Sequence, residues 1–222
     1  MLDTLLSFIA PHHCSGCGDS ATMLCDNCKY DIISDPYSAC VACGHGIAGR
    51  TGLCGDCHPP YDRAWCVAPR LDHVEQLLNN YKFHYAKAAH RPLAALLHEH
   101  LPELPAHVRV VPVPTINSHI RQRGYDHTLL IAKALAKKRG LLIDTSLQRA
   151  TSTMQRGANA RTRTAQAKRA FRVKAALDPD AVYLLLDDVI TTGATVKYAA
   201  KALKDAGAQY VWVVAICRQP LD

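Results

Sequence analysis

From Tyr61 onward, the pattern of apolar and polar positions predicts alternating strands and helices. The apolar segment at 63–69 indicates a strand. Residues 71–81 then place apolar side chains at the i, i+3, i+4 and i+7 spacing of a helix, at Val74, Leu77, Leu78 and Tyr81. Asp72 and Glu75 have the spacing of a capping box, which predicts that the helix begins there.

The middle of the chain continues this alternation. Pro92 favours the first turn of a second helix that begins near Arg91. The segment 108–114, "VRVVPVP", indicates a strand that its prolines end. Asp126 is the expected N-cap of a third helix, and Gly140 is its expected C-terminal glycine.

The last forty residues read as a strand–helix–strand unit. Val182–Leu186 is a continuous apolar run, which is typical of a parallel strand buried on both faces. Residues 196–206 form a helical pattern closed by Gly207, and 210–217 indicate another strand. The pattern therefore predicts an α/β domain with a parallel sheet.

Residues 1–60 lack this periodicity and contain eight of the ten cysteines as four C-x-x-C pairs. The pairs are Cys14 and Cys17, Cys25 and Cys28, Cys40 and Cys43, and Cys54 and Cys57. Such pairs predict two structural Zn²⁺ ions, each held by four thiolates, with sequential pairing preferred over interleaved pairing. A redox or disulfide cluster is the alternative. Cys66 and Cys217 lie in predicted strands and are expected to be ordinary buried thiols. We expect a double zinc-ribbon domain at 1–60 and a second domain at 61–222.

Composition favours a globular protein rather than a membrane or exported one. The 222 residues are 49% hydrophobic and 20% charged, and no apolar run approaches the ~20 residues of a membrane helix. The opening segment 1–11 lacks the features of a signal peptide and is expected to form a short docking helix, so a cytoplasmic location is expected. Two zinc–thiolate sites would lower the formal net charge from +7 to +3, because each carries −2.

The segment "LLLDDVITTGATV", residues 184–196, carries the candidate chemistry. In open α/β sheets, ligands bind beyond the carboxyl ends of the strands, where Asp187 and Asp188 are expected. The small-residue turn at Thr191–Thr195 leads into a helix, so its amides suit an anion, a phosphate better than a carboxylate. The two acids suit a vicinal diol, so the segment predicts a ribose 5-phosphate site. A plain strand-to-helix turn is the alternative, and no Walker A sequence is present.

This segment resembles the phosphoribosyl pyrophosphate (PRPP) motif of type I phosphoribosyltransferases. Nearly the whole chain resembles one branch of that superfamily, the ComF/GntX proteins linked to DNA uptake in competence. The shared motifs are the cysteine pairs, "YKF" at Tyr81–Phe83, "VPVP" at Val111–Pro114, "RQRGYDH" at Arg121–His127 and "TMQ" at Thr153–Gln155. The resemblance implies a type I phosphoribosyltransferase-like parallel sheet flanked by helices and preceded by a small zinc-ribbon domain with four-cysteine sites.

The resemblance also implies residue roles. Lys82 would meet pyrophosphate, Arg121 and Arg123 would lie on a mobile flap, and Asp187 and Asp188 would bind the ribose hydroxyls. The 5-phosphate would contact Thr191, Thr192, Gly193, Ala194 and Thr195. If the protein is an enzyme, Lys82, Asp187 and Asp188 would be its catalytic residues, and pyrophosphate would leave C1 through an oxocarbenium-like state. Mg²⁺ would arrive with PRPP, because it prefers phosphate oxygens.

Some positions depart from the family pattern. Asp126 and His127 replace an Asn-Gln pair, and Gln166 stands where an Asn is usual. Thr191 replaces an Asp that purine-salvage relatives are thought to use for the base, which argues against hypoxanthine or guanine as the acceptor. The sequence shows no convincing nucleophile or general base for an acceptor.

A basic segment between Thr145 and Leu177 contains no acidic residue. Its candidate nucleic-acid-binding residues are Arg156, Arg161, Arg163, Lys168 and Arg169. Such a segment suits the phosphates of PRPP or of a polynucleotide, and a solvated helix face is the alternative. Phe171 is its one aromatic residue, so base stacking is poorly supported within it.

Together with the family resemblance, these observations predict a PRPP-binding, phosphoribosyltransferase-like protein that handles imported single-stranded DNA in the cytoplasm during natural competence. Its expected partners are PRPP or a ribose phosphate, single-stranded DNA and other DNA-uptake proteins. One alternative is an active phosphoribosyltransferase of nucleotide or nucleobase metabolism with an unknown acceptor. Another is a scaffold whose former active site is idle.

Overall fold

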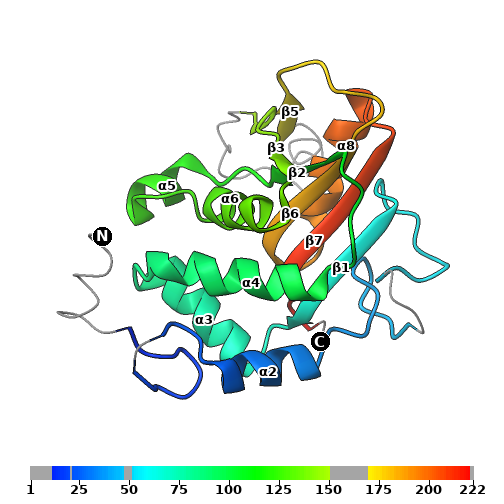
Figure 1. Ribbon diagram of the computed structural model, residues 1–222. Helices are drawn as coiled ribbons and strands as arrows, with labels where there is room; N and C mark the ends of the chain where they lie inside the picture. The colour runs from blue at the N-terminus through cyan, green and yellow to red at the C-terminus, as the bar shows by residue number, and fades with distance from the viewer. Residues whose placement is uncertain (1–11, 21, 48–51, 151–169, 221–222) are drawn as a thin grey trace, which may run out of the picture.

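A five-stranded parallel sheet forms the centre of the molecule (Figure 1). The computed structural model describes residues 12–20, 22–47, 52–150 and 170–220. The strands lie in the order β1-β7-β6-β2-β3. Their bounds are β1 (Arg63–Pro69), β2 (Val108–Pro112), β3 (Leu142–Ile143), β6 (Val182–Ile190) and β7 (Tyr210–Arg218). A second sheet pairs β4 (Leu147–Arg149) with β5 (Phe171–Val173) in antiparallel fashion.

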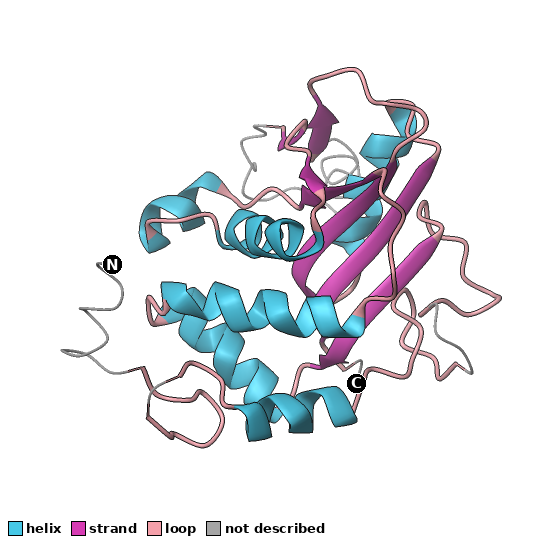
Figure 2. Ribbon diagram, viewed as in Figure 1, coloured by secondary structure: helices cyan, strands magenta, loops and turns pink. Residues whose placement is uncertain are grey.

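Helices cover both faces of the parallel sheet. Figure 2 shows α4 and α6 on the face toward the viewer and α8 behind the strands. The helices are α2 (Asp26–Ser34), α3 (Asp72–Phe83), α4 (His90–His100), α5 (Asn117–Arg123), α6 (His127–Arg139) and α8 (Ala194–Asp205), with a 3-10 turn, η1, at Lys87–Ala89. Among the described residues, no helix is both long and apolar enough to cross a bilayer. The expected docking helix at 1–11 lies outside the described residues.

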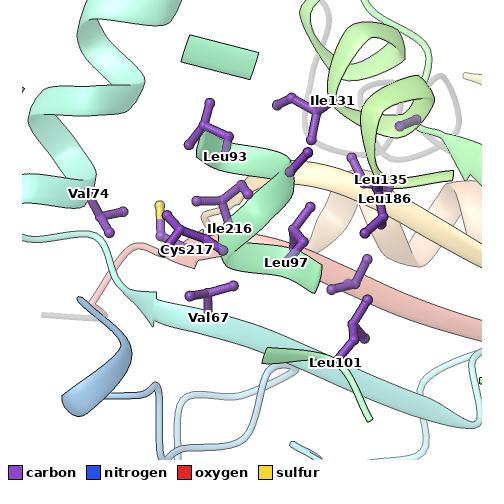
Figure 3. Close-up of a cluster of buried hydrophobic side chains, with 14 of the residues drawn as sticks. Val67, Val74, Leu93, Leu97, Leu101, Ile131, Leu135, Leu186, Ile216 and Cys217 are labelled. Carbon is purple, nitrogen blue, oxygen red and sulfur yellow. The ribbon is translucent and has the colours of Figure 1, made fainter. Parts of the chain in front are cut away.

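Side-chain alternation along the strands divides the core into two. Leu184 and Leu186 of β6 belong to the cluster that contains α4 and α6, whereas Tyr183 and Leu185 belong to the cluster that contains α8. Figure 3 shows the first cluster, where Leu97 of α4 lies near the sheet. Both faces of β6 are therefore buried, which explains its continuous apolar run.

The cysteine-rich region packs directly on the sheet. Cys14, Cys28 and Ile32 share one buried cluster with Trp65 and Val67 of β1. Val41, next to Cys40, belongs to the cluster on the α8 side. The described part of the cysteine-rich region thus shares both cores, and the boundary near residue 60 stays a prediction.

Most predicted elements are present, and the fold class is confirmed: a parallel α/β sheet flanked by helices follows two groups of four cysteines. The Asp126 side chain accepts from the Leu129 amide and caps α6 as expected. The capping box of α3 is wrong. Leu71 is the N-cap and no side chain caps it, and Asp72 has a left-handed φ of 44°. Glu75 instead pairs with Arg70 at 3.2 Å, so its carboxylate is held away from the cap.

Candidate functional site at the carboxyl edge of the sheet

Two adjacent acids near the carboxyl end of β6 form the centre of the site. The strand extends to Ile190, so Asp187 and Asp188 lie within it, and Asp187 pairs with Ala215 of β7. Both acids are buried. Asp188 Oδ2 lies 2.8 Å from Lys82 Nζ at the end of α3 and 2.8 Å from His127 Nε2 at the start of α6. Three separate elements therefore meet at one carboxylate.

The two acids have opposite electrostatic environments. Burial alone would raise the pKa of Asp188, but the charge of Lys82 and the hydrogen bond from His127 hold it well below its usual range. Burial, and after it the charge of Asp188, raises the pKa of Asp187 to about 7. Asp188 is thus the ionised member of the pair, and Asp187 is easily protonated near neutral pH.

A chain of polar contacts extends from Asp188 to the predicted flap. Arg123 Nη1 lies 2.9 Å from His127 Nδ1. A guanidinium can only donate, so Nδ1 accepts and the His127 proton lies on Nε2, the atom that is 2.8 Å from Asp188 Oδ2. The Tyr81 hydroxyl donates to the His127 backbone carbonyl at 2.8 Å. His127 is therefore fixed in place, and it links Arg123 to the acid.

The small-residue turn after β6 is open to solvent. Thr191, Thr192 and Thr195 are exposed, and α8 begins at Ala194. Gly193 is the N-cap, with a left-handed φ of 75°. Gly193 has no side chain to cap the helix, and the Ala194 amide donates to Thr192 Oγ1 at 3.4 Å. The positive end of a twelve-residue helix thus faces solvent beside the two acids.

The structure brings some predicted site residues together and leaves others apart. Lys82, Arg123 and Asp188 belong to one contact network. Arg121 is exposed on the same short helix, α5, as Arg123. The basic residues predicted to meet nucleic acid lie outside the described residues: Arg156, Arg161, Arg163, Lys168 and Arg169.

One site residue was missed in the sequence. His127 received no role from the sequence, although it ends a motif shared with the family and departs from the family pattern, yet it contacts Asp188 directly. Only its local position was predictable, because it follows the N-cap Asp126 and therefore occupies the first turn of a helix. Arg149 is also near: its charge lowers the pKa of Asp187, after the larger effects of burial, Asp188 and Lys82.

The cysteines form two groups with the same local geometry. The sulfurs within each group lie within 4.8 Å of one another, and the groups follow the predicted sequential order. The members are Cys14, Cys17, Cys25 and Cys28 in the first group and Cys40, Cys43, Cys54 and Cys57 in the second. The two knuckles repeat each other, since Gly18 donates to Cys14 and Gly44 donates to Cys40 through their amides.

The donor set of each group fits zinc. Four sulfurs at this spacing suit tetrahedral Zn²⁺. A Cβ on Gly16 would lie 2.5 Å from Cys28 Sγ, so the knuckle leaves no room for a side chain. Burial opposes ionisation of Cys14, but amide hydrogen bonds outweigh it and lower the pKa of Cys14 to about 6. Bound zinc would cross-link each pair of knuckles and stabilise this region.

A cavity of 520 Å³ lies elsewhere, between the first cysteine group and the start of α3. Asp31, Asp35 and His73 contribute to its walls. No residue predicted to bind PRPP lines it. The acids of β6 therefore lie apart from this cavity.

Proteins with names from DNA uptake and use match this chain along most of its length. Competence protein F of Haemophilus influenzae is 28% identical over 210 residues, which cover 88% of this chain and 90% of that protein. DNA utilization protein YhgH of Escherichia coli is 30% identical over 209 residues, with the same coverage of each chain. The chain belongs to the ComF/GntX family. No family model matches the chain.

Two solved structures resemble part of the chain. One is described as the allosteric regulatory enzyme of purine biosynthesis, with a TM-score of 0.42 and 16% identity. The other is a glutamine PRPP amidotransferase from B. subtilis complexed with ADP and GMP, with a TM-score of 0.41 and 17% identity. Each match covers 57% of this chain and 25% of the other. Similarity at this level says nothing about function.

Proposed function

We propose that this ComF/GntX protein binds PRPP at the carboxyl edge of β6 and acts in the cytoplasmic handling of imported single-stranded DNA. The observation that carries the first half is the juxtaposition of two buried acids with an open, glycine-capped helix N-terminus. The 5-phosphate would accept hydrogen bonds from the amides of the turn. The ribose hydroxyls would donate to the acids.

The contacts of the acids indicate which oxygens would receive the diol. Asp188 uses Oδ2 for both Lys82 and His127. Asp187 uses Oδ1 to accept from the Asp188 amide at 2.9 Å. We assign the diol to the other two oxygens, Asp188 Oδ1 and Asp187 Oδ2.

When PRPP binds, Lys82 would move its ammonium from Asp188 to the pyrophosphate leaving group. Its ammonium pairs with Asp188 in this structure, and pyrophosphate would offer it a stronger counter-charge. Arg123, on α5, would close over the same group. Magnesium, when bound with PRPP, would supply neutralisation of the pyrophosphate charge. These cationic side chains would orient the sugar and stabilise charge that develops on the leaving oxygen.

The test of PRPP binding is isothermal titration with PRPP and Mg²⁺. Asp187→Asn is the decisive variant, because the amide keeps the shape and its oxygen can still accept from the Asp188 amide. It puts an NH2 group, which can only donate, in the place of Oδ2, so the dissociation constant should rise about 5- to 150-fold, the equivalent of the ~1–3 kcal/mol that one unpaired polar group costs. Asp205→Asn is the matched control, since Asp205 is exposed at the far end of α8.

Two results would remove the PRPP half of the proposal. One is no heat of binding with the wild-type protein. The other is equal affinity of the wild type and Asp187→Asn. A loss shared by Asp205→Asn would indicate a general effect of acid removal and would equally contradict the assignment.

The DNA half rests on the relatives' names and on the acid-free basic segment at 145–177. Binding through that segment would release counterions, so affinity for single-stranded DNA should fall steeply with salt. Neutralising Arg161 and Arg163 should weaken binding and lower the salt slope by about 1.4, at ~0.7 per contact. Affinity that does not change with salt would contradict this half.

A further inference from the structure

Two large aromatic side chains stand in solvent where α3 ends. Phe83 is 60% exposed and Tyr85, two residues later, is 69% exposed. Tyr81, two residues before Phe83, is fully buried and supports His127. Single exposed apolar side chains are common on protein surfaces. Two rings within three residues, beside a candidate binding site, form a local aromatic surface that core packing does not explain.

Cations flank these rings. The Arg123 guanidinium lies 5.6 Å from the centre of the Phe83 ring. Lys82 directly precedes Phe83, and Arg121 is exposed on α5. Figure 1 shows α5 and the end of α3 on the same side of the molecule. Aromatic faces and positive charges therefore alternate over a short distance.

A shared positive field extends around this surface. Burial, followed by the nearby charge of Arg123 and the smaller effects of Arg149 and Lys82, lowers the pKa of His119 on α5. Those cations come from three elements that converge here, α3, α5 and β4. A ligand that combines flat apolar rings with closely spaced negative charges matches this surface.

We propose that Phe83 and Tyr85 form a base-stacking face for single-stranded DNA, whose phosphates lie against Arg121. The inference rests on the proposed function and gives it a second contact surface, separate from the basic segment at 145–177. Every base has a π-face, so such stacking tolerates any sequence. Duplex DNA would not fit, because its bases are already stacked on one another.

The experiment compares two oligonucleotides on three proteins by fluorescence anisotropy. One probe is single-stranded oligothymidine, and the other is an abasic strand of the same length, which keeps the phosphates and lacks the bases. The variant is Phe83→Ala with Tyr85→Ala. The matched control is Tyr30→Ala with Tyr210→Ala, because those rings are 71% and 50% exposed on other elements, α2 and β7.

The wild type should bind oligothymidine more tightly than the abasic strand. Phe83→Ala with Tyr85→Ala should bind oligothymidine about 5- to 150-fold more weakly per lost stack, with little change for the abasic strand. Its salt slope should stay that of the wild type, since no charge is removed. The control variant should behave as the wild type for both probes.

The outcomes separate this inference from the proposed function. If the wild type binds neither probe, the DNA half of the proposed function fails and this inference fails with it. If the wild type binds both probes equally, or the Phe83→Ala, Tyr85→Ala variant matches the wild type, only the stacking face is overturned. Urea unfolding of the same variant checks its fold, because both replaced side chains are more than half exposed and their loss should leave the stability close to that of the wild type.

Discussion

Replacing Lys82 by Met tests whether Asp188 depends on a buried counter-charge. The Lys82 ammonium lies 2.8 Å from Asp188 Oδ2, with side-chain exposures of 17% and 5%. Removing one partner of a buried pair costs about 3–5 kcal/mol, because the other charge is left uncompensated. His127 Nε2 still lies 2.8 Å from Asp188, and Lys82 is partly exposed, so we expect a loss of about 2 kcal/mol, a substantial part of a domain's ~5–15 kcal/mol.

The assay is urea unfolding at neutral pH. Lys201→Met is the matched control, because Lys201 also pairs with a single acid, Asp205, at 2.7 Å. That pair is more than half exposed and spans one helical turn, so its loss should cost only about 0.3–0.5 kcal/mol. The two variants remove the same charge, and only the burial of the pair differs.

The pH dependence of the stability loss also tests whether Asp188 is ionised. Without Lys82 the pKa of Asp188 should rise, so the penalty should shrink as the pH is lowered and the carboxylate is protonated. Equal losses for Lys82→Met and Lys201→Met would refute the buried ion pair. If Lys82→Met were more stable than the wild type, burying the Lys82 ammonium would cost more than its pairing with Asp188 contributes.

Three further outcomes follow from the same geometry. Burial and the charge of Asp188 raise the pKa of Asp187 from 3.8 to about 7. The stability that protonated Asp187 contributes is therefore complete below about pH 4 and is lost as the pH rises through 7. The Asp187→Asn variant should show a smaller decline of the unfolding free energy over this pH range. Chelation of zinc should lower the melting temperature of the whole chain and change tryptophan fluorescence, because Cys28 and Trp65 share one buried cluster. An unchanged melting temperature would contradict this prediction. Gly193→Ala should cost about 1–2 kcal/mol in chemical unfolding through its φ of 75°, since the nearest atom to the added Cβ is 3.9 Å away; no loss would show that the turn relaxes freely.

Local chemistry explains what the sequence could predict. The continuous apolar run of β6 indicated a strand buried on both faces, and α4 and α8 cover those faces. The cysteine spacing indicated two groups of four, because each C-x-x-C turn has one short-range geometry. Asp126 marked the start of α6, because its side chain accepts from a backbone amide of the first turn. Gly140 marked the end of α6, because it adopts a left-handed φ.

The features that the sequence did not predict depend on contacts between different segments of the chain. Nothing near His127 in the sequence shows that it meets Asp188, which follows much later in the chain, because that contact needs the parallel order of β2 beside β6. The capping box failed at Glu75 for a similar reason, since Arg70 competes for the carboxylate. The strand also continues past the acids to Ile190, because β7 pairs with it as far as Arg218. Contacts with other segments of the chain, rather than the intrinsic helix or strand propensity of the local sequence, decided these details.

A crystal structure of the protein soaked with PRPP and magnesium tests the central claim most directly. We expect the 5-phosphate against the amides of Thr191–Thr195, the ribose hydroxyls on Asp187 and Asp188, and the Lys82 ammonium moved from Asp188 to pyrophosphate. Density for PRPP at any other place, or an unchanged Lys82–Asp188 pair in crystals that contain bound PRPP, would contradict it.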